Sequence, residues 1–347
     1  MDLRDALRAV ATGDTLARAV ARSIFTDALS EGTDPTVFGA LLAALAQRGE
    51  TTEEIAGAAD ALRDAMTPFE ANGIETAIDT CGTGGDGLGM FNLSTSAAIV
   101  ASAAGARVVK HGNRSLSSRC GSADLLEAAG IPVDLSAAAS RAVFEEVGIT
   151  FLFAPTFHPA MRFAAPIRKA LGIRTIFNYL GPLCNPARVR RQLLGTSDPA
   201  RTEDFANVLE QLGHERAYVV HGAGGADELT LAGPNRALAV GTAPTLGFDA
   251  TDVGLSESGV DALVGGEVED NLRLLNRLLD PAHPADDQRP LYEALLLNTA
   301  CALVIAELAA DGREGVELAR RALETGAALE KLETWRASAA RHGGGAR

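Results

Sequence analysis

The chain has 347 residues, of which 47% are hydrophobic and only 5% aromatic, and its formal net charge is −14. This length is enough for one large or two unequal domains, with cores built mainly from alanine, valine, leucine and isoleucine. The acidic balance argues against a protein that binds nucleic acid through a basic surface. A small anionic substrate would therefore need a local basic cluster.

The sequence also indicates a compartment. Its N-terminal residues lack the apolar core of a secretory signal, and no stretch is long and apolar enough to span a membrane. The four cysteines are widely spaced, with no C-x-x-C pair. We expect a cytoplasmic protein with reduced thiols and no membrane partner.

Residues 1 to about 67 have helical patterns only. Asp34 and Pro35 have the order of a helix cap and a first helical residue, and apolar residues follow at helical spacing until Gly49. Thr51 and Glu54 have the spacing of a capping box at the start of another helix. We expect a helical domain over residues 1–70.

The same helices are candidates for self-association. The commonest closed assembly is a twofold dimer, and a small helical domain is a good place for its interface. We expect a homodimer through the N-terminal helices that buries part of the face with Leu41, Leu42 and Leu45.

From residue 76 onward, short β-prone runs alternate with helical patterns, which is typical of an α/β domain with a mostly parallel sheet. The run at 76–80 leads into a glycine-rich loop, followed by Ser94 and Thr95 at the start of an alanine-rich helix. Glycine lets backbone N–H groups approach an anion closely. Serine or threonine here is expected to cap the helix, whose N-terminus favours phosphate. The loop is therefore a candidate phosphate site.

A second run, at 107–109, is followed by a basic and hydroxylated turn over residues 110–118, and Gly121 and Ser122 start another helix. Two such turns on consecutive strands predict a site for more than one phosphate.

Three interpretations of the glycine-rich loop compete. Its glycines match the dinucleotide spacing G-x-G-x-x-G, but Asp86 would repel a pyrophosphate there and the turn is long and polar. A P-loop is excluded because no Gly-Lys-Ser/Thr closes the motif. An ordinary glycine-rich turn remains open, although the second polar turn makes it less attractive.

Later segments continue the alternation. A helix is expected from Ser136, strands at 149–153, 192–196 and 216–221, and a helix at 202–212. The turn after the last of these strands presents Asp227 and Glu228 side by side. Adjacent carboxylates suit Mg²⁺, although an isolated pair is more often a simple polar turn. We expect an α/β domain over residues 74–336 and a disordered tail over 337–347.

Several long motifs in order carry a family resemblance. GTGGDG, FNLST, KHGNRSLSS, GSADLLEAAG and the segment 151–187 resemble the signature segments of the anthranilate phosphoribosyltransferase family. The resemblance implies a small all-helical N-terminal domain, joined by part of residues 155–190. It also implies a larger α/β domain with a mostly parallel central sheet and helices around it. The implied reaction transfers 5-phosphoribosyl from phosphoribosyl pyrophosphate (PRPP) to the amine of anthranilate, in tryptophan synthesis.

The resemblance also implies residue roles. Donor contacts fall on Gly82, Gly85, Asp86, Asn92, Leu93, Ser94, Thr95, Lys110, His111, Gly112, Asn113, Arg114, Ser115, Leu116, Ser117, Ser118 and Ser122. Anthranilate contacts fall on Gly82, Asn113 and Arg168, and His111, His158 and Pro182 line the acceptor path. Two Mg²⁺ ions are implied, one on Ser94 and Glu228 and one on Asp227 and Glu228.

No general base is assigned by the resemblance. The family usually has threonine where this chain has Met90, so a hydroxyl contact to the donor is lost.

Two alternatives stay open at the level of the sequence. Pyrimidine nucleoside phosphorylases share the fold that the resemblance implies and would use inorganic phosphate and a nucleoside. A non-catalytic relative that binds nucleic acid would need a basic groove and would have lost its metal ligands. This chain is acidic and retains Asp227 and Glu228, so we expect PRPP and anthranilate as partners and no nucleic acid.

Overall fold

The computed structural model describes residues 1–115, 119–282 and 288–344. The chain opens with helices α1 (Leu3–Ala11), α2 (Arg18–Ala28), α3 (Pro35–Arg48) and α4 (Thr52–Ala65). The Asp34 side chain accepts hydrogen bonds from backbone N–H groups in the first turn of α3. Pro35 is the first residue of this helix, and Gly49 is its C-terminal cap. Thr51 and Glu54 form both hydrogen bonds of a capping box on α4. The predicted starts of both helices are confirmed.

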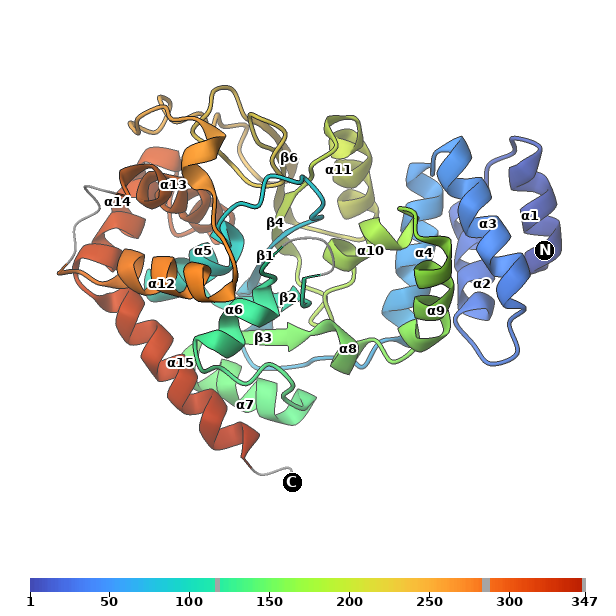
Figure 1. Cartoon of the computed structure of the whole chain (residues 1–347), viewed down its shortest axis with the longest axis horizontal. Helices are drawn as coiled ribbons and strands as arrows, with labels where there is room; N and C mark the ends of the chain where they lie inside the picture. The colour runs from blue at the N-terminus through green and yellow to red at the C-terminus, as the bar shows by residue number, and fades with distance from the viewer. Residues whose placement is uncertain (116–118, 283–287, 345–347) are drawn as a thin grey trace.

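A six-stranded sheet occupies the middle of the molecule (Figure 1). Its strands lie in the order β3-β2-β1-β4-β5-β6, and only β6 is antiparallel to its neighbour. The strands are β1 (Ile78–Gly82), β2 (Val108–Gly112), β3 (Ile149–Phe153), β4 (Arg191–Gly195), β5 (Arg216–His221) and β6 (Arg236–Gly241). The expectation of a mostly parallel sheet is confirmed.

Helices cover the sheet on both sides. The first four helices lie at one end of the molecule and the C-terminal helices at the other (Figure 1). The remaining elements are η1 (Ile74–Thr76), α5 (Leu93–Ala103), α6 (Ser122–Ala128), α7 (Ala137–Val147), α8 (Ala154–Phe157), α9 (Met161–Leu171), α10 (Phe177–Leu183), η2 (Pro199–Arg201), α11 (Thr202–Gln211), η3 (Val260–Leu263), α12 (Val268–Leu279), α13 (Arg289–Ile305), α14 (Gly312–Glu324) and α15 (Ala327–Gly343).

Alternating side chains of the strands feed two separate cores. Leu193 and Tyr218 join the core formed with α5 and α13–α15, whereas Leu194 and Val219 join the core that contains α1–α4. This is the period of two expected for a strand covered on both faces. The helical bundle is thus packed against the sheet through a continuous core.

The segment 155–190 packs back onto the N-terminal helices, as the resemblance implied. Phe177 at the start of α10 makes edge-to-face contacts with Phe25 of α2 and Phe38 of α3, at centroid distances of 5.9 and 6.1 Å. Because this core runs from the bundle to the sheet, the boundary between two domains stays a prediction.

Two expectations about this architecture were wrong. Helix α15 continues to Gly343, so residues 337–343 are helical, and residues 345–347 lie outside the described part. Leu41, Leu42 and Leu45 have no exposed surface in the single chain, because they pack inside the bundle core. They are therefore not available to a second copy.

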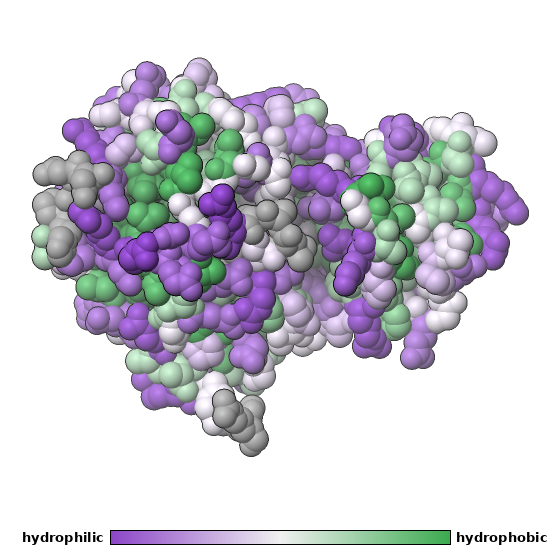
Figure 2. Space-filling view, in the orientation of Figure 1, coloured by the Kyte–Doolittle hydropathy of each residue, from purple (hydrophilic) through white to green (hydrophobic). Residues whose placement is uncertain are grey.

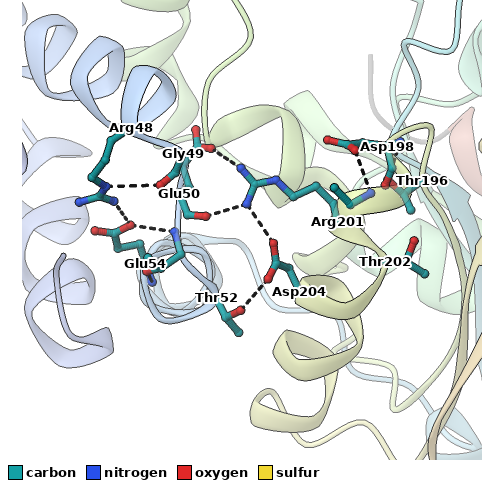
Figure 3. A network of polar contacts seen from close by, with 12 residues as sticks. Arg48, Gly49, Glu50, Thr52, Glu54, Thr196, Asp198, Arg201, Thr202 and Asp204 are labelled. Carbon is teal, nitrogen blue, oxygen red and sulfur yellow. Dashed lines mark hydrogen bonds and ion pairs between the residues drawn. The ribbon is translucent and has the colours of Figure 1, made fainter. Parts of the chain in front are cut away.

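A polar network ties the bundle to the sheet (Figure 3). Arg201, at the end of η2, donates to Glu50 Oε2 at 2.9 Å and to Asp204 Oδ2 at 3.0 Å. Thr52 at the start of α4 donates to the other oxygen of Asp204 at 3.0 Å. The connection between α3 and α4 is thereby fixed to the crossover between β4 and β5.

Replacing Arg201 by alanine should destabilise the protein. The Glu50 side chain is only 3% exposed, and it would lose its ion-pair partner. Breaking a buried pair by removing one partner costs about 3–5 kcal/mol, which urea denaturation would measure as a lower free energy of unfolding.

The matched control is Arg4→Ala, which removes a pair with Asp34 whose side chains are 66% and 45% exposed. An exposed pair is worth about 0–1 kcal/mol. Equal losses in the two variants would contradict the structural role given to Arg201.

Candidate active site

The order of the strands places the site. The chain runs outward from β1 to β2 and β3 on one side, and to β4 and β5 on the other. Ligands of such sheets bind outside the carboxyl ends of the strands where this direction changes. The glycine-rich loop leaves β1 there, the basic turn leaves β2, and the Asp227–Glu228 turn follows β5. Three clusters that the sequence singled out therefore meet at one edge.

The two acids contact the glycine-rich loop and the first turn of α5. Gly84 N donates to Asp227 Oδ2 at 2.6 Å, and Ser94 N donates to Glu228 Oε1 at 3.1 Å. The predicted metal residues Ser94, Asp227 and Glu228 are thus brought together, although Ser94 and Glu228 are 134 residues apart in the sequence.

The close contact of Asp227 with the sheet requires glycine at the ends of two paired strands. Gly82 and Gly195 are partners in the β1–β4 register. A Cβ on Gly195 would lie 1.7 Å from the Asp227 carbonyl oxygen, and one on Gly82 would lie 2.2 Å from Asp227 Oδ2. Gly195 was not singled out from the sequence, and a glycine inside the predicted strand 192–196 was the available signal.

Burial controls the charge of the acid pair. It is the main reason that the pKa values of Asp227 and Glu228 are raised, and Asp86 raises that of Asp227 further. Lys110, only 1% exposed, partly offsets this effect at Glu228. Its ammonium donates to the Thr80 carbonyl oxygen and to Ser94 Oγ, the latter at 3.3 Å.

These donors fit a divalent cation. Burial disfavours the ionised forms of the two carboxylates, and a bound cation would favour them. Among the residues that the structure describes, no group of three or more His, Cys, Asp or Glu side chains could hold a metal. Two carboxylates and a hydroxyl suit Mg²⁺, which keeps waters and takes phosphate oxygens as its other ligands.

The start of α5 differs from the expected cap. Asn92 occupies the cap position, but its side chain makes no cap hydrogen bond and donates to the Cys120 carbonyl oxygen at 3.0 Å. Ser94 and Thr95 lie inside the first turn, after Leu93. The prediction of a serine or threonine cap was wrong, because these hydroxyls face neighbouring elements. Thr95 Oγ1 lies 3.0 Å from Ser122 Oγ at the start of α6.

The rest of the glycine-rich loop is held by its neighbours. Asp86 accepts from Leu88 N at 3.1 Å, and Arg174 reaches Gly85, where a Cβ would lie 2.3 Å from its Nη1 atom. Met90 forms an isolated bridge with Val264 and packs against the main core. Arg174 was not assigned a site role from the sequence.

The basic turn after β2 is partly neutralised. Arg114, which follows Gly112 and Asn113, donates to Glu127 Oε1 at 2.7 Å, and Ser115 N donates to Asp124 Oδ2 at 2.9 Å. The predicted donor residues Leu116, Ser117 and Ser118 lie outside the described residues. Lys110 and His111, expected in the turn, lie within β2, and Lys110 is the cation that acts on Glu228.

Two histidines that the resemblance places on the acceptor path contact each other. His111 Nε2 and His158 Nε2 are 3.1 Å apart, and His111 Nδ1 lies 3.2 Å from the Gly181 carbonyl oxygen. Burial lowers the pKa of both, that of His158 to about 4, so both rings are neutral near pH 7. A carbonyl oxygen only accepts, so His111 Nδ1 carries the hydrogen, and the bare His111 Nε2 faces His158 Nε2.

Among the described residues, Arg168 has no acidic ion-pair partner, and its guanidinium contacts an aromatic ring of the next helix. It sits in the last turn of α9, half-buried, with its guanidinium 5.5 Å from the centre of the Phe177 ring. Burial lowers the pKa of this guanidinium. An arginine held over an aromatic ring in this way can receive a carboxylate.

Comparison with known proteins identifies relatives over nearly the whole chain. Residues 4–66 match the helical bundle domain of a glycosyl transferase family, and residues 74–329 match its a/b domain. Anthranilate phosphoribosyltransferase from Roseiflexus castenholzii is 46% identical over 96% of this chain and 97% of its own. The enzyme of that name from Chloroflexus aurantiacus is also 46% identical, over 96% and 97%.

Solved structures agree with these relatives. The crystal structure of anthranilate phosphoribosyltransferase from Thermus thermophilus has a TM-score of 0.90 and 41% identity, covering 97% of this chain and 99% of its own. The Saccharomyces cerevisiae enzyme in complex with PRPP and Mg has a TM-score of 0.87 and 26% identity, covering 98% of each chain.

The buried histidine pair predicts a pH dependence of stability. His158 has a folded pKa of about 4 against an ordinary value of 6.5, so the unfolded chain binds more protons between these values. The contribution of neutral His158 to the free energy of unfolding is fully present above pH 6.5 and is lost as the pH falls toward 4. Over that range wild type should lose about 3 kcal/mol more stability than His158→Gln.

Urea denaturation at a series of pH values would measure this difference. The difference between the two free energies of unfolding at pH 8 measures the packing lost in the variant. This difference is subtracted from the differences at lower pH. Parallel curves for wild type and His158→Gln would show that His158 titrates normally in the folded protein.

Proposed function

Because this chain belongs to the anthranilate phosphoribosyltransferase family, we propose how its residues divide the work of that reaction. The enzyme transfers the 5-phosphoribosyl group from PRPP to the amine of anthranilate, giving N-(5-phosphoribosyl)anthranilate and pyrophosphate in the second step of tryptophan synthesis from chorismate. The observation that carries the assignment of roles is the meeting of the glycine-rich loop, Lys110 and the Asp227–Glu228 pair at one sheet edge.

The donor lies in this proposal across the carboxyl ends of β1 and β2. Breaking the anomeric C–O bond places negative charge on the leaving pyrophosphate and positive charge on the ribose. Backbone N–H groups of the loop from Gly82 to Gly87 and of the first turn of α5 orient the diphosphate, and Lys110 adds a fixed positive charge. These groups are held before the substrate arrives, so little reorganisation accompanies the reaction.

Two Mg²⁺ ions are proposed, one on Ser94 and Glu228 and one on Asp227 and Glu228. When bound, they supply positive charge that stabilises the departing pyrophosphate. Support comes from the half-buried acid pair and from the yeast relative whose structure contains PRPP and Mg. Asp86 lies close enough to raise the pKa of Asp227, so it also biases this region toward cations.

Anthranilate lies between the histidine pair and Arg168. The guanidinium of Arg168 pairs with the carboxylate, while Asn113 and the edge of Gly82 border the acceptor. Both ring nitrogens of His111 are engaged, so it does not serve as a general base. We propose that proximity and leaving-group stabilisation carry the rate.

The assembly is proposed to be a cytoplasmic homodimer through the N-terminal helices. Its contact surface must differ from the buried leucines of α3. Hydrophobic side chains remain visible over this end of the molecule in Figure 2, and Ile173 beyond α9 is 51% exposed. A monomeric mass by light scattering at micromolar concentration would contradict the proposed dimer.

The acid pair should determine the metal dependence. Asp227→Asn with Glu228→Gln keeps the size of both side chains but removes their charge, so turnover should fall on the order of 10²-fold or more. Steady-state rates across a Mg²⁺ titration, with thermal unfolding as a check on folding, measure this. An unchanged Mg²⁺ dependence would refute the metal assignment.

Arg168 should separate the acceptor site from the donor site. Arg168→Ala removes a charge-assisted contact worth roughly 1.5–3 kcal/mol, so the KM for anthranilate should rise about 10- to 150-fold. The KM for PRPP should barely change, and Arg168→Lys, which keeps the charge without the planar fork, should give only partial recovery. A rise in the PRPP constant alone would place Arg168 at the phosphates.

A further inference from the structure

A hollow lined by arginines lies at the opposite edge of the sheet from the active site. Its volume is about 220 Å³, and it is lined by Arg18, Arg22, Asp60, Arg63, Asp64, Arg188, Gln211 and Leu212. Arg188 precedes β4 and Leu212 precedes β5, so the hollow borders the amino ends of these strands. A larger hollow of about 770 Å³ continues from it along α2.

Three of the four arginines have acidic partners. Arg18 forms two parallel hydrogen bonds with Asp60, at 2.7 and 3.0 Å. Arg22 donates to Asp64 at 2.6 Å, and Arg188 lies 3.6 Å from the other oxygen of the same carboxylate. Two aspartates thus serve three arginines.

Arg63 differs from the other three. It is 9% exposed, and its Nε atom is enclosed without a hydrogen-bond partner. Within the described chain, no hydrogen bond or ion pair of its guanidinium is found, although its carbonyl oxygen accepts from Arg188 at 3.0 Å. Burial lowers the pKa of this guanidinium, and the charges of Arg188 and Arg18 act in the same direction. A buried charge without a partner is costly, so the arrangement calls for an anion.

The charge of the hollow indicates which kind of anion. Four arginines and two aspartates leave an excess of two positive charges, in a chain whose net charge is −14. A phosphate group carries close to two negative charges near neutral pH and presents several acceptor oxygens. Guanidinium groups match such oxygens with pairs of parallel hydrogen bonds.

We propose that this hollow is a second anion site, which binds a small dianion of the phosphate class with Arg63 as its buried anchor and Arg188 and Arg22 as its outer contacts. The site is separate from the transfer reaction and does not depend on the roles proposed for the active site. It joins α4 of the bundle to the segment before β4, and Arg18 extends the junction by donating to the Gln211 carbonyl oxygen at 3.1 Å. Bound anion therefore holds the bundle against the amino ends of β4 and β5.

The test uses inorganic phosphate as the probe and the full chain as the protein. Phosphate is titrated by calorimetry and by thermal unfolding, in the presence of saturating PRPP and Mg²⁺ and without anthranilate, so that the active site is occupied. Wild type is compared with Arg63→Gln. The matched control is Arg4→Gln, an exposed arginine of α1 whose partner is Asp34.

We expect Arg63→Gln to weaken phosphate binding about tenfold to a hundredfold, whereas Arg4→Gln leaves it unchanged. The Tm of wild type rises with phosphate concentration, because a ligand of the folded state stabilises it. In phosphate-free buffer, Arg63→Gln should be at least as stable as wild type, since it removes an unpaired buried charge.

Three results would overturn the proposal. Equal phosphate binding by wild type and Arg63→Gln would show that the hollow is not the site. A lower Tm of Arg63→Gln without phosphate, with no phosphate effect on wild type, would make Arg63 purely structural. Loss of self-association in Arg188→Glu, with no phosphate binding, would assign the arginines to acids of a second copy. If Arg63→Gln does not fold, Arg188→Gln, with a side chain 54% exposed, replaces it in each comparison.

Discussion

Asp227 can lie at the carboxyl ends of β1 and β4 only because both strands end in glycine. Any side chain at Gly195 would overlap the backbone of Asp227, and one at Gly82 would overlap its carboxylate. The turn after β5 therefore packs directly on the strand ends, where Gly84 N and Ser94 N reach the two acids. The glycine-rich loop, the start of α5 and the acid turn depend on this contact for their relative positions.

Electrostatics at this edge work against the charge of the whole chain. The protein is strongly acidic, yet its two substrates are anions. Lys110 is the buried cation beside the acid pair, while Arg114 is paired with glutamate on α6. Most of the compensation for the pyrophosphate must come from backbone N–H groups and metal ions, which act locally in a partly buried site. Burial raises the pKa values of Asp227 and Glu228, and a nearby cation would favour their ionised forms.

The acceptor side depends on the position of the bundle. Phe177 joins the aromatic cluster of α2 and α3 and also lies under Arg168, so one ring couples bundle packing to the arginine that faces anthranilate in our proposal. Arg201 with Glu50, and Arg18 with the Gln211 carbonyl oxygen, link the same bundle to the α/β part at two further places. Any change in how the bundle sits against the sheet would therefore move the acceptor side relative to the donor loop.

The sequence by itself determined the alternation of strands and helices, the starts of α3 and α4, and the family, because caps, periodicity and long motifs are local signals. It also named Ser94, Asp227 and Glu228. Tertiary structure decided what depends on distant contacts: Gly195 and Arg174 reached the site through neighbouring segments, and Ser94 and Thr95 lie inside a turn that they were expected to cap. Leu41, Leu42 and Leu45 were mistaken for an interface because an apolar helix face looks the same in sequence whether its own fold or a second copy covers it.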